Sequence, residues 1–293
     1  MNILHRTATG LGAVLEAHRL WLDRARGGQR ADLSGAMLTD LKLERVDLRS
    51  ALLCSASFLD SCLDGANLAG ANLSGADLRN ASLAAADFTE ADLTGAHLQH
   101  AWLADANLSE AKLIATRFQN ATLRDCRLFE AHLSECDFTQ ANLRGAAFNH
   151  SSLVDCRFSQ AHLDSARFVH ARLRSCLFSG ASMELTDFTF ATLQDCDLRG
   201  AQLLSAKFHQ ADLSRSVLVQ ASVHSCNFTQ ANLAATDFSF SALAGSRFSE
   251  ANLLAADLTR ADLSGARDLA AQQLLRARTS PTRFFRMAAE VRM

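Results

Sequence analysis

Residues 66–78 read ANLAGANLSGADL, a stretch in which a leucine recurs at every fifth position and an alanine stands two positions before it. The same spacing extends in both directions, because a large apolar residue occupies every fifth position from Leu33 to Leu263, forty-seven times without an insertion or deletion. A small residue precedes almost every one of them by two positions, and Leu41 and Val46 are the large exceptions. A period of five fits neither a helix of about 3.6 residues per turn nor the alternation of a strand. The sequence therefore predicts a stack of identical small units.

Within each repeat, two residues are expected to point inward and three outward. Alternate residues of an extended segment share a face, so the large residue and the small residue two before it face the interior together. The other three positions carry nearly all of the Asp, Asn, Arg, Gln and Ser, as a solvated surface does. Each buried Leu or Phe stabilises such a fold by about 1.5–3 kcal/mol.

The repeats match a known consensus. Ala66–Gly70, Ala71–Gly75 and Ala91–Gly95 each fit the pattern A(D/N)LXX, and over residues 31–266 the chain resembles the pentapeptide-repeat family. This resemblance implies an all-β solenoid, a right-handed quadrilateral β-helix with four pentapeptides per coil and about 12 coils in one elongated body. Every Phe in the large position has a number ending in 8. Two opposite walls of such a coil are therefore expected to carry rings, and the other two to be aliphatic.

The ends of the chain do not follow the repeat and divide it into three segments. We expect an N-terminal helical cap at 1–30, the pentapeptide-repeat β-helix at 31–266 and a C-terminal helical segment at 267–293. Leu11, Val14, Leu15, His18 and Trp21 follow a helical period, which indicates a helix that covers the first coil. A repeat stack needs covered ends, because an open end pairs with strands of other chains.

The C-terminal segment contains two short helical patterns. Ala270–Arg278 is typical of a short helix, and Ser280 and Pro281 are typical of the N-cap and first turn of another. The second helix would carry apolar residues that are unusual in a solvated tail: Phe284, Phe285, Met287 and Val291. Two interpretations stay open. These residues either cap the solenoid or pair two chains in a homodimer, as C-terminal elements often do in the family.

Composition limits the location of the protein. No apolar run approaches the roughly 18 residues of a membrane helix, and Met1–Gly10 lacks the apolar core of a signal peptide. The eight cysteines show no metal-finger spacing. In a chain without a signal peptide, this pattern indicates a reducing compartment. We therefore expect a cytoplasmic protein with no membrane association.

The net charge of −2 conceals an uneven distribution. Residues 31–266 hold 27 acidic and 18 basic side chains, a net of −9, whereas the two flanks together hold 4 and 11, a net of +7. Within the repeats, residues 31–110 hold 12 acidic and 4 basic side chains, a net of −8. Residues 111–180 hold 6 and 9, a net of +3. Such a distribution bears on the choice of partner rather than on the fold.

No catalytic or cofactor-binding motif stands out from the repeat. Asp and Ser recur at every corner, so no Ser/His/Asp combination is distinctive, and no glycine-rich segment leads into a helix as in a phosphate loop. Cysteines recur every twenty residues from Cys136 to Cys196, in the slot otherwise held by a small residue. A straight column of thiols cannot surround zinc, which favours a filling role. We therefore expect no catalytic residue, no cofactor and no metal.

One set of residues spaced by twenty could instead bind a metal ion. His150, His170 and Phe190 are also spaced by twenty residues, which would place them on neighbouring coils. Two imidazoles one coil apart can hold a metal ion weakly, but no third ligand is evident in the sequence. An exposed ladder of stacked rings is favoured over a metal site.

The resemblance also suggests a function. Qnr-type and MfpA-type members of the family engage the DNA-binding groove of type II topoisomerases, DNA gyrase especially, as mimics of DNA, and so protect the enzyme against inhibitors or modulate it. The acidic repeats fit this hypothesis, whereas the basic residues of 111–180 oppose it. Qnr-type members carry loops that contribute to protection, and this chain has none, so only a loop-free mode remains open. The alternative is a rigid scaffold or adaptor, associated with secretion or signalling, that has no topoisomerase role.

Both hypotheses require a protein-binding surface, and neither requires direct contact with nucleic acid. The partner under the first hypothesis is DNA gyrase or topoisomerase IV. The candidate surface combines acidic side chains with large apolar residues predicted to point outward: Asp32, Asp47, Asp77, Asp87, Asp92, Trp102, Phe129, Phe190 and Phe240. Large outward apolar residues are informative because a solvated surface seldom gathers them.

Overall fold

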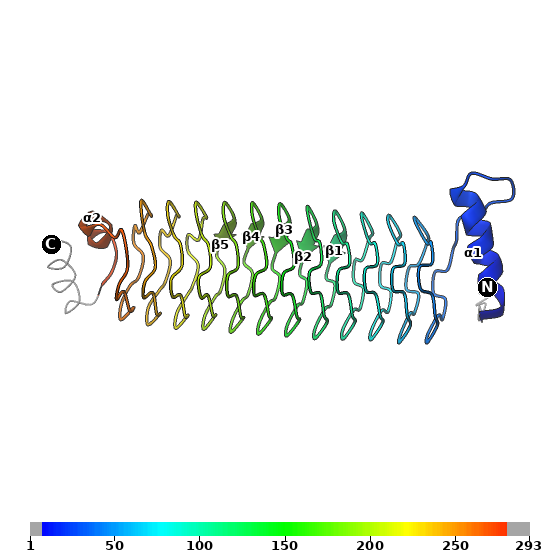
Figure 1. Cartoon of the computed structure of the whole chain (residues 1–293), viewed down its shortest axis with the longest axis horizontal. Coiled ribbons are helices and arrows are strands. Elements are labelled where there is room, and N and C mark those ends of the chain that lie inside the picture. The colour runs from blue at the N-terminus through cyan, green and yellow to red at the C-terminus, as the bar shows by residue number, and fades with distance from the viewer. Residues whose placement is uncertain (1–7, 280–293) are drawn as a thin grey trace. The chain divides into compact units, whose positions relative to one another are not determined.

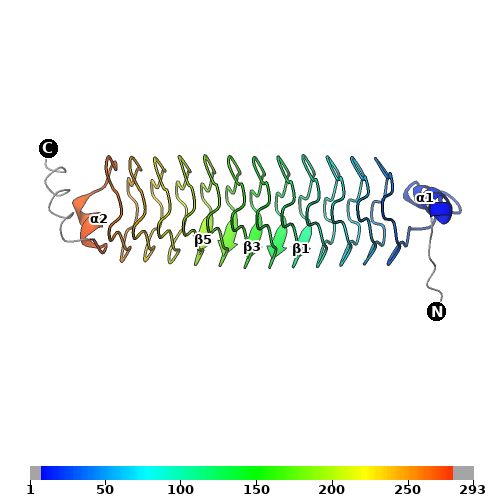
Figure 2. The same cartoon turned by 90° about the horizontal axis from the view of Figure 1, so that it is seen from below.

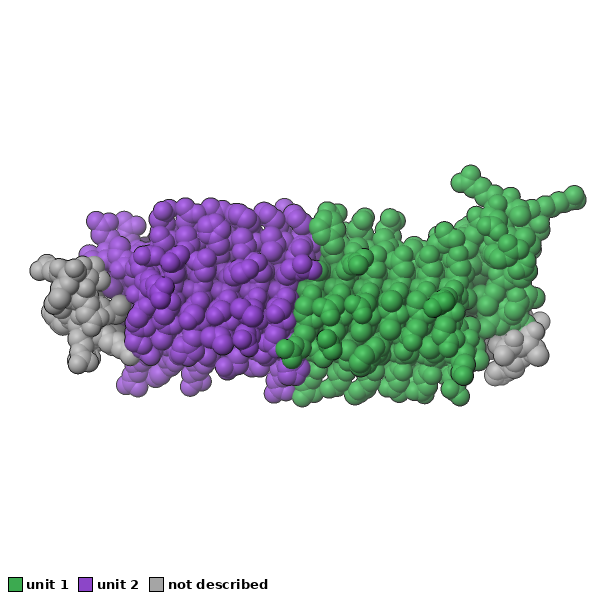
Figure 3. Space-filling view, in the orientation of Figure 1, with its two compact units in different colours: residues 1–147 green, residues 148–293 purple. Residues whose placement is uncertain are grey.

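The computed structural model describes residues 8–279. The chain forms two compact units, residues 1–147 and residues 148–293 (Figure 3), and each is described by itself. The predicted helix that begins at Ser280 and Pro281, with its four apolar residues, lies outside the described residues.

Both units are built from parallel bridges between residues twenty positions apart. Asp32 pairs with Leu52 in the first unit, and Arg167 pairs with Asp187 in the second. A bridged residue recurs at every fifth position, so four pentapeptides make one coil, and successive coils run in parallel (Figure 1). The fold is therefore a parallel β-solenoid, and the predicted fold class is confirmed. The number of coils stays a prediction. We call a set of residues spaced by twenty a column.

Five short segments are regular enough to count as strands: β1 (Lys112–Ile114), β2 (His132–Ser134), β3 (Ser152–Val154), β4 (Arg172–Arg174) and β5 (Thr192–Gln194). β1 pairs with β2 in the first unit, and in the second unit β4 pairs with both β3 and β5, all in parallel. Each strand is followed two residues later by Thr116 or by a cysteine of one column. The strands thus lie beside Thr116 and the four cysteines of this column, where a larger side chain replaces alanine.

Most corners are tight turns closed by one backbone hydrogen bond, whereas the N–H groups of Cys196 and Cys226 donate instead to a serine hydroxyl of the next coil. In a typical corner, the N–H of Ala91 donates to the carbonyl of Phe88 at 2.9 Å. The second central residue of every regular corner has a positive φ, from 50° at Ala115 to 72° at Gly145. For a residue other than glycine, this backbone conformation costs about 1–3 kcal/mol. The ladder and the core must therefore hold the corners in place.

The interior is filled by the large residue and by the small residue two before it. Rings stack along a wall, as with Phe148 and Phe168 at 4.6 Å between centroids and Phe158 and Phe178 at 4.8 Å. Rings of opposite walls meet edge to face, as with Phe148 and Phe158 at 6.0 Å and 86°. Both arrangements suit the aromatic quadrupole. The two predicted ring-bearing walls are confirmed.

Polar residues in the small inward slot satisfy their hydrogen bonds inside the solenoid. The hydroxyl of Thr116 donates to the carbonyl of Leu93 at 2.9 Å, and the hydroxyl of Thr236 donates to that of Leu213 at the same distance. In each pair the acceptor is the large inward residue twenty-three positions earlier. A buried hydroxyl is costly unless it is paired, so this recurring contact explains why Ser, Thr and Cys can replace alanine there.

One helix precedes the first coil. Helix α1 (Ala8–Leu22) lies beside that coil in both views (Figure 1, Figure 2). His18 of α1 is completely buried, and its Nδ1 accepts a hydrogen bond from the N–H of Ala31 at 3.1 Å. Leu33 and Leu38, in the first coil, are only 2% and 1% exposed.

A second, shorter helix interrupts the ladder near the end of the described chain. Helix α2 (Ala271–Leu275) buries Leu274. The Nε2 of Gln273 donates to the carbonyls of Phe248 at 2.9 Å and Ala251 at 2.8 Å. The chain then returns to the ladder, where Arg278 pairs with Asp257 in parallel. Within residues 8–279, neither helix has the length and hydropathy that a membrane-spanning segment needs.

Candidate protein-binding surface

The acidic residues named from the sequence do not share one side of the coil. The bridges place Asp32 and Asp92 in one column, Asp47 and Asp87 in a second, and Asp77 in a third. The five carboxylates therefore do not form a single acidic row.

Most of these carboxylates are also paired within the chain. Asp47 accepts from Arg49, and Asp77 accepts from Arg79, in each case with 2.7 Å between an oxygen and a guanidinium nitrogen. The hydrogen bond from the neighbouring arginine lowers the pKa of both carboxyl groups below its ordinary value. A carboxylate that is neutralised by a neighbour attracts a basic partner only weakly.

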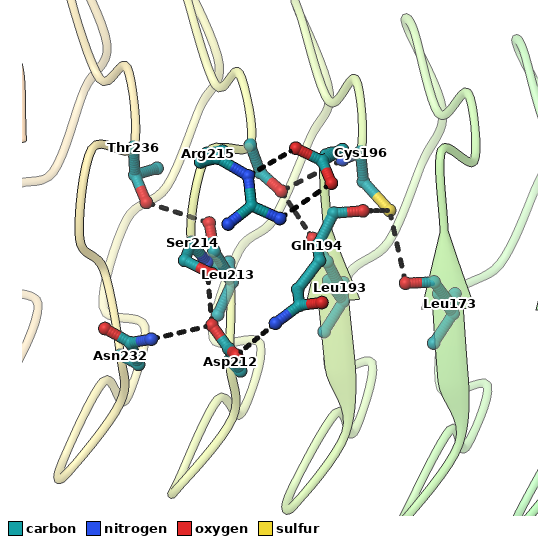
Figure 4. Close-up of polar contacts among 12 residues, drawn as sticks. Leu173, Leu193, Gln194, Cys196, Asp212, Leu213, Ser214, Arg215, Asn232 and Thr236 are labelled. Atoms are coloured by element: carbon teal, nitrogen blue, oxygen red, sulfur yellow. Dashed lines mark hydrogen bonds and ion pairs between the residues drawn. The ribbon is translucent and has the colours of Figure 1, made fainter.

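Other ion pairs and amide ladders join neighbouring coils. Asp212 accepts hydrogen bonds from Gln194 at 2.8 Å and from Asn232 at 2.9 Å (Figure 4). Arg215 pairs with Asp195 of the preceding coil at 2.7 Å. Much of the polar surface thus makes its hydrogen bonds and ion pairs within the chain. The charged side chains that have no ion-pair partner are therefore the better candidates for binding another protein.

A different set of carboxylates does gather along one corner column of the first unit. Glu90, Glu110 and Glu130 occupy the same corner position on successive coils, all with φ between 54° and 59°. The three are exposed, and none has an ion-pair partner among the described residues. Asp87 and Asp92 flank Glu90 on the two adjoining sides, and Asp92 is paired with Lys112 of the next coil at 3.2 Å. Successive coils lie about 4.8 Å apart, so the charges form a close-spaced line.

An exposed aromatic ring belongs to the same corner. The N–H of Glu110 donates to the carbonyl of Phe129 at 2.9 Å, and the Phe129 side chain is 41% exposed. We use the name acidic corner for the following residues: Asp87, Glu90, Asp92, Glu110, Phe129 and Glu130. These three glutamates are not among the surface residues predicted from the sequence, which selects acidic residues by type. Numbering by columns of twenty would have found them.

The other large apolar residues named from the sequence are exposed, but they occupy three different columns. Trp102 is 50% exposed, Phe190 42% and Phe240 51%. The ring of Phe240 carries the guanidinium of Arg260 at 5.3 Å from its centroid, a cation–π contact within the chain. The sequence interpretation missed further exposed side chains, which are as prominent and also stand at outward positions: Met37, Leu177, Leu185, Leu204 and Leu254.

A corner of the second unit carries the opposite charge. The rings of His150 and His170 stack at 5.0 Å, and those of His170 and Phe190 stack at 4.8 Å. Arg167 and Arg172 flank His170, and both are exposed. The predicted ring ladder is confirmed. Within residues 8–279, no three His, Cys, Asp or Glu side chains lie close enough together to hold a metal ion.

The cysteine column is part of the core. Cys156, Cys176 and Cys196 are buried in the second unit and Cys136 in the first, and none of the four forms a disulfide. Hydrogen bonds with the thiols of Cys156 and Cys196, together with burial, raise the pKa of Cys176 well above its ordinary value. Burial also raises the pKa of the Cys226 thiol to about 12. Thiols held in the protonated form are poor nucleophiles.

Comparisons with known protein families identify the repeat. The model described as pentapeptide repeats (8 copies) matches overlapping segments over residues 31–145 and also residues 226–265. The model described as pentapeptide repeat region matches residues 128–208. The chain belongs to the pentapeptide-repeat family. A comparison with curated protein sequences gave no significant match.

Several solved structures of pentapeptide-repeat proteins are similar to this chain. HetL from the cyanobacterium Nostoc, a protein involved in heterocyst differentiation regulation, is 27% identical, with 89% of this chain and 92% of HetL covered and a TM-score of 0.34. A protein from the thylakoid lumen of Arabidopsis thaliana is 33% identical over 33% of this chain and 63% of its own, with a TM-score of 0.28. QnrB1, a plasmid-mediated fluoroquinolone resistance protein, is 19% identical over 62% of this chain and 97% of its own, with a TM-score of 0.34. These relatives differ in function, and TM-scores this low give no argument about a partner.

Proposed function

We propose that this pentapeptide-repeat protein is a non-catalytic scaffold that binds a basic surface of a partner protein through the acidic corner. The observation that carries the proposal is the line of unpaired glutamates at Glu90, Glu110 and Glu130. Other acidic side chains, such as Asp47 and Asp77, are neutralised by neighbouring arginines. The three glutamates stand on successive coils of one column, so their attraction for a cationic partner adds up at this corner.

The acidic corner has the two features that a docking surface needs. Its carboxylates steer a basic partner and fix its register, because complementary charge acts on association rate and specificity. The exposed ring of Phe129 beside Glu110 supplies apolar area, and buried aromatic anchors carry much of the energy of protein interfaces. The solenoid holds both on a rigid ladder, so little conformational entropy is lost on binding.

We propose DNA gyrase, or topoisomerase IV, as the first partner to test. A surface that binds DNA is basic, because it must neutralise phosphates. A line of carboxylates at the spacing of successive coils offers such a surface a substitute for a phosphate backbone. The concentration of acidic side chains in residues 31–110, with a net charge of −8, supports this assignment.

The test is a gyrase supercoiling assay, with and without a fluoroquinolone, in which purified protein is titrated into the micromolar range. The account predicts inhibition of supercoiling, or protection against the drug, that declines as salt is raised. Absence of inhibition, protection and binding at micromolar protein would remove topoisomerase as the partner.

A second candidate is a scaffold or adaptor with no topoisomerase role. The basic side chains of residues 111–180, with a net charge of +3, favour it, because a mimic of DNA has no use for a basic region. The exposed Trp102 lies outside the acidic corner and would then serve as another contact. If the protein is such a scaffold, Trp102→Ala should reduce the amount of partner protein recovered in a pull-down and should leave gyrase activity unaffected. If the Trp102 variant captures the same proteins as the wild type, Trp102 is not part of the docking surface.

A further inference from the structure

The corner at Arg167, His170 and Arg172 carries an unpaired positive surface. Arg167 and Arg172 are exposed, and neither has an ion-pair partner among the described residues. The ring of His170 is fixed by stacking on His150 at 5.0 Å and on Phe190 at 4.8 Å. Because neighbouring rings occupy both faces of His170, its ring edge is the part that remains open to a ligand. We call Arg167, His170 and Arg172 the basic corner.

The acidic corner presents the opposite charge on the same backbone frame. Residues 87, 90 and 92 are Asp, Glu and Asp, and the corresponding residues 167, 170 and 172 are Arg, His and Arg. The corner φ angles are 57° at Glu90 and 59° at His170. The turn at Glu90 closes with a hydrogen bond of 2.9 Å, and the turn at His170 closes with one of 3.0 Å. Acidic and basic groups therefore stand at equivalent positions of one repeating corner.

We infer that the acidic corner of one molecule docks on the basic corner of a second copy of this chain. The glutamates of the acidic corner repeat at about 4.8 Å per coil, whereas Arg167, His170 and Arg172 surround one turn. The basic groups of one molecule can therefore lie among carboxylates from several coils of the other. Imidazole and guanidinium groups offer hydrogen-bond donors, and carboxylates accept them. Exposed aromatic rings, Phe129 at one corner and Phe190 at the other, add apolar contact.

This self-association does not depend on the proposed topoisomerase partner, and it would compete with any partner of the acidic corner. Exposed ion pairs contribute little to affinity, so the complex is expected to be weak and sensitive to salt. Docking between copies also differs from dimerisation through residues 284–291, which is a separate prediction about a segment outside the described residues.

Sedimentation of the full chain at low and high salt tests the inference. Wild-type protein should associate at about 50 mM salt and dissociate at about 500 mM, because screening shortens the range of the charges. The double variant Glu90→Lys/Glu110→Lys should be monomeric at low salt, and so should Arg167→Glu/Arg172→Glu. A control at exposed arginines away from the basic corner, Arg117→Glu/Arg157→Glu, should associate like the wild type.

Mixing the two reversed variants gives the decisive result. One then carries two basic corners and the other two acidic corners, so the mixture should form a complex at low salt although each variant alone does not. Circular dichroism of each variant checks that it is folded. A wild-type chain that is monomeric at low salt, a salt-independent dimer, or reversed variants that fail to associate when mixed would each overturn the inference.

Discussion

His18 is a buried residue of α1, and its titratable ring joins the helix to the first coil. Its Nδ1 accepts from the N–H of Ala31, so that nitrogen must be unprotonated. Burial is the largest influence on His18 and lowers its pKa below the ordinary value, although Asp47 opposes the shift. The Arg30 side chain favours the neutral ring. Arg49 acts both ways, because its backbone carbonyl favours the protonated ring and its guanidinium the neutral ring.

The lowered pKa of His18 fixes the direction of a pH effect. In the unfolded chain the ring titrates near its ordinary pKa of about 6.5, so below that pH the unfolded state binds more protons than the folded one. The contribution of His18 to stability is therefore complete above about pH 6.5 and is lost as the pH falls toward the folded pKa. We predict that the contact of α1 with the first coil weakens on acidification.

Trp21 reports on this contact, because its ring stacks on His18 at 5.5 Å between centroids. In a Trp102→Phe background, Trp21 is the only tryptophan, and its fluorescence should change between about pH 7 and pH 5. The variant His18→Gln keeps an acceptor but cannot titrate, so its signal should stay flat. The same transition in His18→Gln would show that another group is responsible.

Glycine stabilises a corner because it adopts a positive φ without strain. Gly200 has a φ of 65°, and a Cβ added there would meet no atom within 4 Å. Gly200→Ala should therefore lower the free energy of unfolding by about 1–2 kcal/mol through backbone strain alone. Gly10, in α1, is equally open but helical, so Gly10→Ala should be neutral or stabilising by up to about 1 kcal/mol. Denaturant unfolding, monitored by circular dichroism, measures the free energy of unfolding of both variants. Equal effects of Gly200→Ala and Gly10→Ala would contradict the role of backbone strain at the corner.

At the scale of elements, α2 shows how the ladder ends. In a regular coil, the N–H of Asn72 donates to the carbonyl of Ala51, twenty-one residues earlier. The corresponding carbonyl of Ala251 instead accepts from the side chain of Gln273 at 2.8 Å. The side chain thus replaces a backbone donor that α2 has removed from the ladder.

We predict that Gln273→Ala destabilises the last coil by about 1–2 kcal/mol. The carbonyl of Ala251 loses the donor of Gln273, and the carbonyl of Phe248 keeps only the N–H of Ala251. Hydrogen exchange should become faster around Ala251 and around Phe248, the other acceptor of Gln273. The neighbouring Gln272 is exposed, so Gln272→Ala is the matched control and should leave exchange unchanged. Equal exchange rates in the two variants would show that Gln273 does not close this end.

The sequence predicts the structure of the N-terminal end better than that of the C-terminal end. The apolar period correctly indicated a helix in α1, and the low exposure of Leu33 and Leu38 supports our proposal that α1 caps the first coil. At the other end, the sequence indicated a helix over Ala270–Arg278, and the observed helix is Ala271–Leu275. The return of Arg278 to the ladder was not predictable, because it depends on side-chain hydrogen bonds of Gln273 that leave no periodic signal.

At the scale of the whole molecule, the repeat decides which residues can meet. Because the repeat has no insertion from Leu33 to Leu263, residue numbers alone give the columns, and the ring-bearing walls followed directly from them. The sequence predicts the candidate surface less well, because the five aspartates that it names lie in three columns. Local pairs, such as Asp47 with Arg49, depend on side-chain conformation that the repeat pattern does not encode.

The central claim is that the acidic corner is a protein-binding surface, and its charge can be reversed without touching the core. Glu90 and Glu110 are exposed, and other corners already accommodate basic side chains at the same φ, as at Arg45 and Arg215. Glu90→Lys/Glu110→Lys should therefore fold normally. The matched control Asp40→Lys/Glu135→Lys changes the net charge equally at exposed sites outside the acidic corner.

The most direct measurement is the binding of DNA gyrase to immobilised wild-type protein and to these two variants at low salt, run together with the supercoiling assay. The account predicts micromolar or tighter binding of the wild type and of the control, and a loss of about tenfold or more for Glu90→Lys/Glu110→Lys. Gyrase that binds all three proteins equally, or none of them, would contradict it.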